Sequence, residues 1–174
     1  SGSSFANAPG ADVDWDAALS GARLLHLSGI TPALGPDAAN AALAAARAAR
    51  RLGVPVSFDG NYRAMLWEAW DSNPRAILSE LIGLADILFG NHRDLSLVLD
   101  RDFSGDGADR RREAAEAGFA AFPNLRIIAS TARHTLSADH HRIAARVDLR
   151  DGAHQTDEAD VAGIVDRIGA GGPV

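Results

Sequence analysis

The sequence contains no cysteine, which excludes disulfide bonds and every metal site built on thiolates. Aromatic residues make up only 6% of the 174 residues, so the core must be packed mainly with aliphatic side chains. No apolar run approaches the roughly 20 residues needed to cross a bilayer, and Ser1–Ser4 does not resemble a signal peptide. We therefore expect a cytoplasmic protein that does not act at a membrane.

Positive charge is also scarce, with a net charge of −6 and a pI near 5.4. This balance argues against a surface for nucleic acid or for anionic lipid. The basic cluster at 110–112 is followed by Glu113 and Glu116, a pattern typical of a solvated helix face. The hydrophobic fraction of 47% and the long alanine-rich stretches are instead typical of one globular domain with closely packed helices.

Two kinds of segment alternate along the chain. Buried strands are predicted by short apolar runs at residues 24–29, 54–58, 86–90 and 125–129. Helices are predicted at residues 36–52, 74–84, 93–99 and 108–122. This order predicts parallel strands joined by right-handed crossovers.

The pattern changes near the C-terminus. Residues 142–149 alternate polar and apolar, and Asp151-Gly152 predicts a hairpin turn before a strand at 153–156. The expected fold is α/β, a mostly parallel sheet flanked by helices with an antiparallel hairpin edge. We expect residues 1–12 to be a loose N-terminal segment and residues 13–174 to form a single α/β domain.

Polar residues follow each predicted strand, where ligands bind in open parallel sheets. The second strand is followed by Asp59, Asn61 and Arg63, and the third by Asn91 and Asp94. The fourth is followed by Thr131 and Arg133, and a last apolar run at 164–168 leads into Gly169, Ala170 and Gly171. A glycine turn of this kind holds anions when it opens a helix. These groups suit oxyanions or Mg²⁺, and no dedicated metal-ligand spacing is present.

Each of these groups also has a purely structural interpretation. Asp59-Gly60 is an ordinary turn pair, and Asn91 with Asp94 could form only a capping box. Arg63 could stack on Trp67. The pair Thr131 and Arg133 could be turn residues, and His134, His140 and His141 solvent-facing loop residues.

Four runs together resemble a known family: HLSGITPAL at 26–34, FDGNYRAMLW at 58–67, Asn91-x-x-Asp94, and DRIGAG at 166–171. They resemble the 2-keto-3-deoxygluconate kinases, which are ribokinase-like (PfkB) carbohydrate kinases. The resemblance runs in order from about residue 12 to 171. It implies a ribokinase-like fold that phosphorylates a sugar acid with ATP and Mg²⁺.

The resemblance also implies roles for individual residues. Arg63 would bind the sugar carboxylate, a natural partner for a guanidinium, with Asn61 and Asp59 beside it. The same resemblance assigns binding of the nucleotide and Mg²⁺ to Asn91, Asp94, Thr131 and Arg133. The anion hole for the transferring phosphoryl group would be Gly169, Ala170 and Gly171.

The chain departs from the family pattern in several places. Gly172 stands where the family has its catalytic aspartate, and Asp94 stands where a glutamate is usual. Nothing in the sequence resembles the family's N-terminal lid region or its C-terminal helices. We therefore expect a partial and inactive form, which associates as a homo-oligomer or with other chains through uncovered surfaces. One alternative is a non-catalytic nucleotide-binding or interaction fragment. A Rossmann oxidoreductase is disfavoured because the glycines follow the last strand instead of the first.

Overall fold

The computed structural model describes residues 13–103 and 107–162, and only the backbone of residues 132–135. Its helices are α1 Trp15–Leu19, α2 Ile30–Ala33, α3 Pro36–Leu52, α4 Ala64–Glu68, α5 Pro74–Leu84, α6 His92–Leu99 and α7 Ala108–Ala121. Its strands are β1 Leu25–Ser28, β2 Val56–Asp59, β3 Ile87–Phe89, β4 Ile127–Ser137, β5 His140–Leu149, β6 Gly152–Gln155 and β7 Ala159–Ala162.

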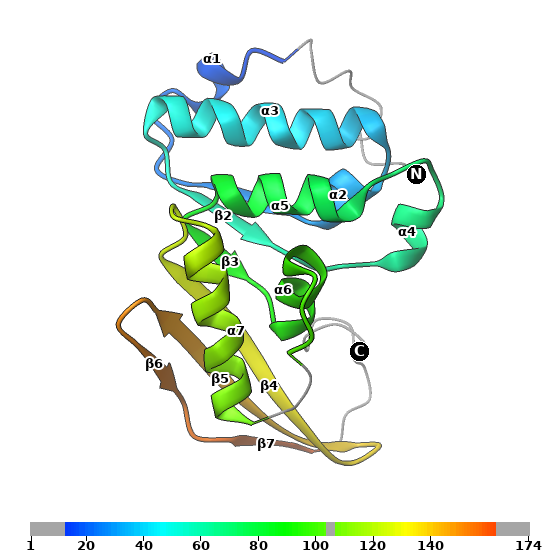
Figure 1. The fold of residues 1–174 in the computed structure, drawn as a ribbon, viewed down its shortest axis with the longest axis vertical. Coiled ribbons are helices and arrows are strands. Elements are labelled where there is room, and N and C mark those ends of the chain that lie inside the picture. The colour runs from blue at the N-terminus through cyan, green and yellow to red at the C-terminus, as the bar shows by residue number, and fades with distance from the viewer. Residues whose placement is uncertain (1–12, 104–106, 163–174) are drawn as a thin grey trace.

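The strands form one seven-stranded sheet in the order β1-β2-β3-β4-β5-β6, with β7 also paired to β5 (Figure 1). Strands β1 to β4 are mutually parallel, and β5 pairs antiparallel with β4, β6 and β7. The predicted mostly parallel sheet with an antiparallel hairpin edge is therefore confirmed.

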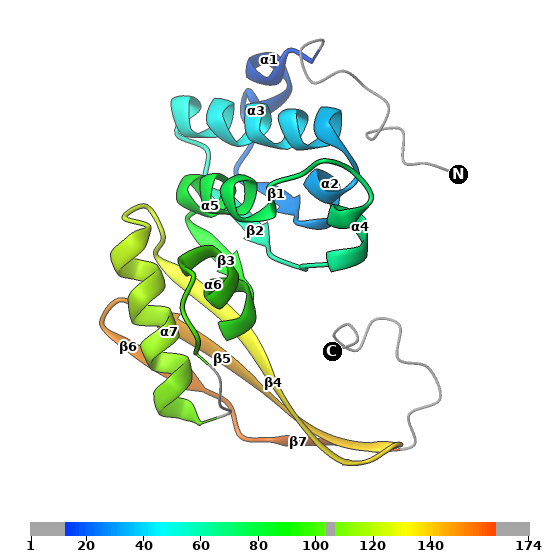
Figure 2. The same ribbon diagram turned by 45° about the vertical axis from the view of Figure 1, so that its right-hand side comes forward.

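The crossover helices α3, α5 and α7 lie along one face of the sheet (Figure 2). Successive right-handed crossovers between neighbouring parallel strands pass on the same side, which explains this arrangement. Val56, Phe58 and Leu88 point into the core on this face, where α3 contributes many buried alanines. On the opposite face Phe89 remains 43% exposed.

Strand β4 is longer than the sequence predicts. The expectation that it ends at residue 129, with Thr131 and Arg133 in a following turn, is wrong. Thr131 pairs with Ala145 and Arg133 with Ile143, inside a long antiparallel arm formed with β5. The partner strand supplies the backbone hydrogen bonds that keep β4 extended beyond the parallel sheet.

The predicted loop position of three histidines is also wrong. His134 lies within β4, and both His140 and His141 lie within β5. His141 is only 3% exposed. The same hairpin that lengthens β4 draws these residues into strands.

Two sequence predictions cannot be located in this fold. The loose segment at 1–12 and the strand at 164–168 lie outside the described residues, as do Gly169, Ala170, Gly171 and Gly172. In the ranges 13–103 and 107–162, no helix is long and apolar enough to span a bilayer.

Candidate functional site

Backbone hydrogen bonds join neighbouring parallel strands one residue beyond the last paired residues at their carboxyl ends. The backbone N–H of Gly29 donates to the carbonyl of Asp59 at 2.6 Å, and that of Gly60 donates to Phe89 at 2.9 Å. Gly90 continues the series by donating to Ala129 at 3.0 Å. These bonds bring the loop after β2 beside the loop after β3.

Three glycines permit this close approach. A β-carbon on Gly29 would lie 2.0 Å from the carbonyl oxygen of Gly60. One on Gly60 would lie 2.8 Å from Cγ of Asp94, and one on Gly90 would lie 3.0 Å from Oδ2 of Asp94. Backbone and carboxylate thus occupy the space that side chains would need at each strand end.

The last residue of β2, Asp59, and the loop after it present the three predicted sugar-binding residues in sequence. The side-chain amide of Asn61 donates to Oδ2 of Asp59 at 3.2 Å, and Arg63 is the N-cap residue of α4. Asn61 has φ 39, a left-handed conformation that asparagine tolerates better than most residues. The local bend turns the Asp59 carboxylate and the Asn61 amide toward each other.

Opposing influences act on the Asp59 carboxyl. Burial raises its pKa, while the nearby His26, the amide of Asn61 and the charge of Arg63 lower it, and the net shift is upward. A carboxyl with such a shift in a strand-end cluster is typical of a functional site.

The start of α6 is a complete capping box. Oδ1 of Asn91 accepts from the backbone N–H of Arg93 at 2.8 Å and of Asp94 at 3.4 Å. Oδ2 of Asp94 accepts in return from the backbone N–H of Asn91 at 2.9 Å. The structural interpretation of Asn91 and Asp94 as a cap is therefore confirmed, and a role in nucleotide binding stays a prediction.

The two carboxyls of the cluster are electrostatic neighbours. Burial raises the pKa of Asp94, and the charge of Asp59 adds to the rise. The backbone amides of Asn91 and Tyr62 lower it, as does Arg93, without cancelling the rise. Two adjacent carboxyls that both resist ionisation form a site that favours a bound cation or proton.

One member of the site was missed by the sequence reasoning. Nδ1 of His26 lies 2.6 Å from Oγ of Ser57, and its ring stands edge-on to Phe89 with centroids 6.1 Å apart. His26 also lowers the pKa of Asp59. The alternation of polar and apolar residues in β1 could have indicated it, because His26 and Ser28 occupy one face of the strand while Leu25 and Leu27 occupy the other.

Other predicted residues are not brought into this cluster. Thr131 and Arg133 belong to the β4–β5 arm. The ring of Trp67, suggested as a stacking partner of Arg63, is buried and stacks on Trp70 with centroids 6.0 Å apart.

The oxygen donors of the cluster suit Mg²⁺ bound with a nucleotide. In the part of the chain that the structure describes, no three histidine or acidic side chains are grouped to hold a metal alone. Mg²⁺ commonly takes one or two carboxylates, several waters and substrate phosphates, so Asp59, Asp94 and their amide neighbours fit that use.

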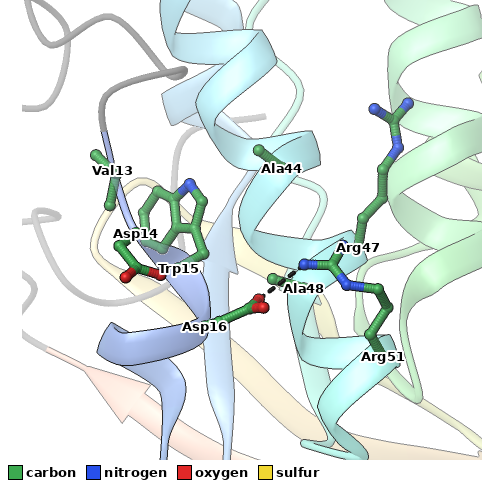
Figure 3. Close-up of a pocket in the computed structure, with 8 residues that line it drawn as sticks. All are labelled: Val13, Asp14, Trp15, Asp16, Ala44, Arg47, Ala48 and Arg51. Atoms are coloured by element: carbon green, nitrogen blue, oxygen red, sulfur yellow. Dashed lines mark hydrogen bonds and ion pairs between the residues drawn. The ribbon is translucent and has the colours of Figure 1, made fainter.

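A separate hollow lies between α1 and α3 (Figure 3). The ion pair between Arg51 and Asp16, at 2.7 Å, crosses it, and Arg47 on its rim pairs with Glu80. Its charged groups already have partners within the chain, and none of the predicted site residues that the structure describes lines it.

Comparison with known proteins agrees with this fold and identifies a family. The profile of the pfkB family carbohydrate kinases matches residues 3–171. A 2-dehydro-3-deoxygluconokinase from Thermotoga maritima is 32% identical with a TM-score of 0.83, and the match covers 97% of this chain and 50% of that one. A PfkB family carbohydrate kinase from Listeria grayi is 31% identical with a TM-score of 0.79, covering 95% and 49%.

A more distant structure shares the fold. A candidate ribokinase II from E. coli, solved in complex with ATP and Mg²⁺, is 15% identical with a TM-score of 0.61. The match covers 85% of this chain and 41% of that one. This chain thus spans about half the length of the solved structures it resembles.

Proposed function

This chain belongs to the pfkB family of carbohydrate kinases, and from that premise we propose that it is a partial form of a cytoplasmic, ATP-dependent kinase of the 2-keto-3-deoxygluconate type. One observation carries the proposal. The loop holding Asp59, Asn61 and Arg63 lies directly against the start of α6, with Asp94 packed on Gly60. Groups suited to a sugar acid and groups suited to a nucleotide therefore meet at one sheet edge.

The loop after β2 is the sugar side of this proposal. The guanidinium of Arg63 binds the carboxylate of the sugar acid, because its planar fork matches two carboxylate oxygens. Asn61 and Asp59 bind sugar hydroxyls. Their mutual hydrogen bond, at 3.2 Å, orients both side chains before the ligand arrives.

In this proposal Asn91 and Asp94 at the start of α6 form the nucleotide side. Thr131 and Arg133 lie on the β4–β5 arm outside the cluster, and only the family resemblance assigns them to the nucleotide. Mg²⁺ supplied with ATP neutralises phosphate charge, and the described residues contribute oxygen donors and position. The glycine turn Gly169, Ala170 and Gly171 completes the proposal as the anion hole.

We expect negligible turnover from this chain. Removal of the proton from the attacking hydroxyl by a general base contributes about 10²–10⁴-fold in such reactions. Gly172 at the expected aspartate position has no group that accepts a proton. A readily measured rate with ATP, Mg²⁺ and 2-keto-3-deoxygluconate would contradict this expectation.

Calorimetric titration with 2-keto-3-deoxygluconate tests the substrate. Arg63→Gln should weaken binding about tenfold or more, because a charge-assisted hydrogen bond is lost. Arg126→Gln is the matched control, since Arg126 is an exposed arginine at the opposite end of the parallel strands. Absence of binding, or equal loss in both variants, would refute the substrate assignment.

The open sheet face supports the predicted association. Phe89 is 43% exposed on the face opposite α3, α5 and α7, and Leu24, just before β1, is 50% exposed. We propose that a second copy of the chain covers this face and its exposed apolar side chains. Phe89→Ser should shift the mass measured by light scattering toward the monomer, and Met65→Ser, an 84% exposed residue on α4, should not. A wild-type monomer that binds no hydrophobic dye would contradict the proposal.

The second candidate function is a non-catalytic nucleotide-binding fragment of the same fold. It is favoured by Gly172, which stands at the expected aspartate position and has no group that accepts a proton. Titration with MgATP separates the possibilities. A nucleotide-binding fragment binds MgATP without binding the sugar acid, and an inert interaction fragment binds neither.

A further inference from the structure

The Asp94 carboxylate points into the molecule, between two strand ends. Its Cγ and Oδ1 both lie 2.8 Å from the position that a β-carbon on Gly60 would take. Its Oδ2 lies 3.0 Å from the corresponding position on Gly90 and accepts the N–H of Asn91 at 2.9 Å. The side chain therefore touches the end of β2, the end of β3 and the first turn of α6.

This placement differs from that of an ordinary capping residue. The cap alone needs one hydrogen bond to Asn91, which an exposed side chain can make. Here the carboxylate also fills the space beside Gly60, and the backbone amide of Tyr62 lowers the pKa of its carboxyl. Asp94 thus holds both ends of the segment from Gly60 to Tyr62, which leads directly into Arg63.

We propose that Asp94 is a positioning residue, whose carboxylate holds the 60–63 loop against the start of α6 so that Asn61 and Arg63 face the sugar acid. This rests on the proposed function for the identity of the ligand. Asp94 would then have two roles. It caps α6, and by packing on Gly60 it positions the loop that carries the sugar-binding residues.

The short side chain of Asp94 suits the narrow space beside Gly60. Gly60 leaves no room for atoms beyond the carboxylate of an aspartate, because even a β-carbon on Gly60 would stand at 2.8 Å. An added methylene at position 94 could not keep its carboxylate in this space and would direct it away from Gly60. Aspartate at 94 and glycine at 60 are therefore matched in size.

Hydrogen exchange measured by mass spectrometry tests the positioning without any ligand. Asp94→Ala should speed exchange in peptides spanning 59–64 by about tenfold or more, because packing and hydrogen bonding are both lost. Asp94→Asn, which keeps the shape and one accepting oxygen, should restore most of the protection. Gly60→Ala should loosen the same peptides by displacing the carboxylate.

Matched controls are present in the chain. Asp37 is an exposed aspartate in the first turn of α3, so Asp37→Ala makes the same chemical change without a strand-end contact. A β-carbon on Gly152 would have nothing within 4 Å, so Gly152→Ala controls for Gly60→Ala. Neither control should alter exchange in peptides spanning 59–64.

Titrations with 2-keto-3-deoxygluconate and with MgATP then assign the role. Positioning predicts that Asp94→Ala weakens binding of the sugar acid about tenfold or more, with rescue by Asp94→Asn. Because the proposed function also places the Asp94 carboxylate on the nucleotide side, MgATP affinity should fall in both variants, and sugar-acid affinity only in Asp94→Ala. Unchanged exchange in Asp94→Ala would overturn the proposal, as would an Asp94→Asn variant that loses sugar-acid binding while its 59–64 peptides stay protected. If the wild type binds no sugar acid, the proposed function fails while the exchange experiment still decides the positioning.

Discussion

Replacing Gly29 by alanine should destabilise the protein through one specific collision. Gly29 has φ −65 and ψ −12, a conformation that alanine adopts freely, so backbone strain does not enter. The new β-carbon would lie 2.0 Å from the carbonyl oxygen of Gly60 and 2.7 Å from that of Asp59. Both obstacles are backbone atoms, which cannot move aside as the end of a flexible side chain can.

Three contributions set the size of the effect. Overpacking that forces backbone shifts costs about 1–3 kcal/mol. Separating the strand ends also weakens the hydrogen bond from Gly29 to Asp59, now 2.6 Å long, at about 1 kcal/mol. Alanine restricts the unfolded chain and returns about 0.4–1 kcal/mol. We therefore expect the free energy of unfolding to fall by about 1–4 kcal/mol.

Urea unfolding followed by circular dichroism measures this loss. At about 2–4 °C per kcal/mol for a domain of this size, thermal unfolding should occur several degrees lower. Gly152→Ala is the control, because its β-carbon would meet nothing within 4 Å. If Gly29→Ala proved as stable as this control, the close contact of the β1 and β2 ends would be wrong.

Three further predictions concern other parts of the molecule. Asp148→Ala should lower the free energy of unfolding by about 3–5 kcal/mol, because it leaves the guanidinium of Arg146, 4% exposed, without its carboxylate; urea unfolding measures this. Asp59→Asn should raise stability at pH 7, since burial raises the pKa of Asp59 and wild-type stability falls as pH rises from 3.8 through the folded pKa. The gain should vanish below pH 3.8 in the same assay, and a gain independent of pH would contradict this cause. Asn91→Ala and Asn73→Ala should each cost about 1 kcal/mol as lost helix caps, but only the former should weaken MgATP binding measured by calorimetry.

The parallel part of the fold was predictable because its signals are local. Apolar runs ended by glycine or aspartate located the strands, and alanine-rich or leucine-rich spacing located α3 and α5. Short helices such as α4, Ala64–Glu68, were not predicted, since a segment of one turn carries too little periodicity. The length of β4 was also missed, because its extension depends on pairing with β5 and not on its own residues.

The site was predictable to a similar extent. Asp59, Asn61 and Arg63 were singled out by their place at the end of a strand, and the structure puts Asp59 and Gly60 beside Asp94 at the start of α6. The roles of these residues in binding stay predictions. His26 was missed because it was counted as part of an apolar run. The packing of Asp94 on Gly60 could not be predicted, since a spacing of 34 residues does not indicate that a carboxylate fills the place of a β-carbon on Gly60.

The electrostatics of the cluster disfavour the ionised forms of both carboxyls. Burial raises the pKa of both Asp59 and Asp94, and the charge of Asp59 raises that of Asp94 further, so each carboxylate is less stable here than in water. Hydrogen bonds from Asn61 and Asn91 offset this cost without removing it. A bound cation would favour both ionised forms, and a group whose ionisation a ligand favours in turn favours that ligand. Under the proposed function, the proximity of the two carboxyls would therefore favour Mg²⁺ carried by a nucleotide.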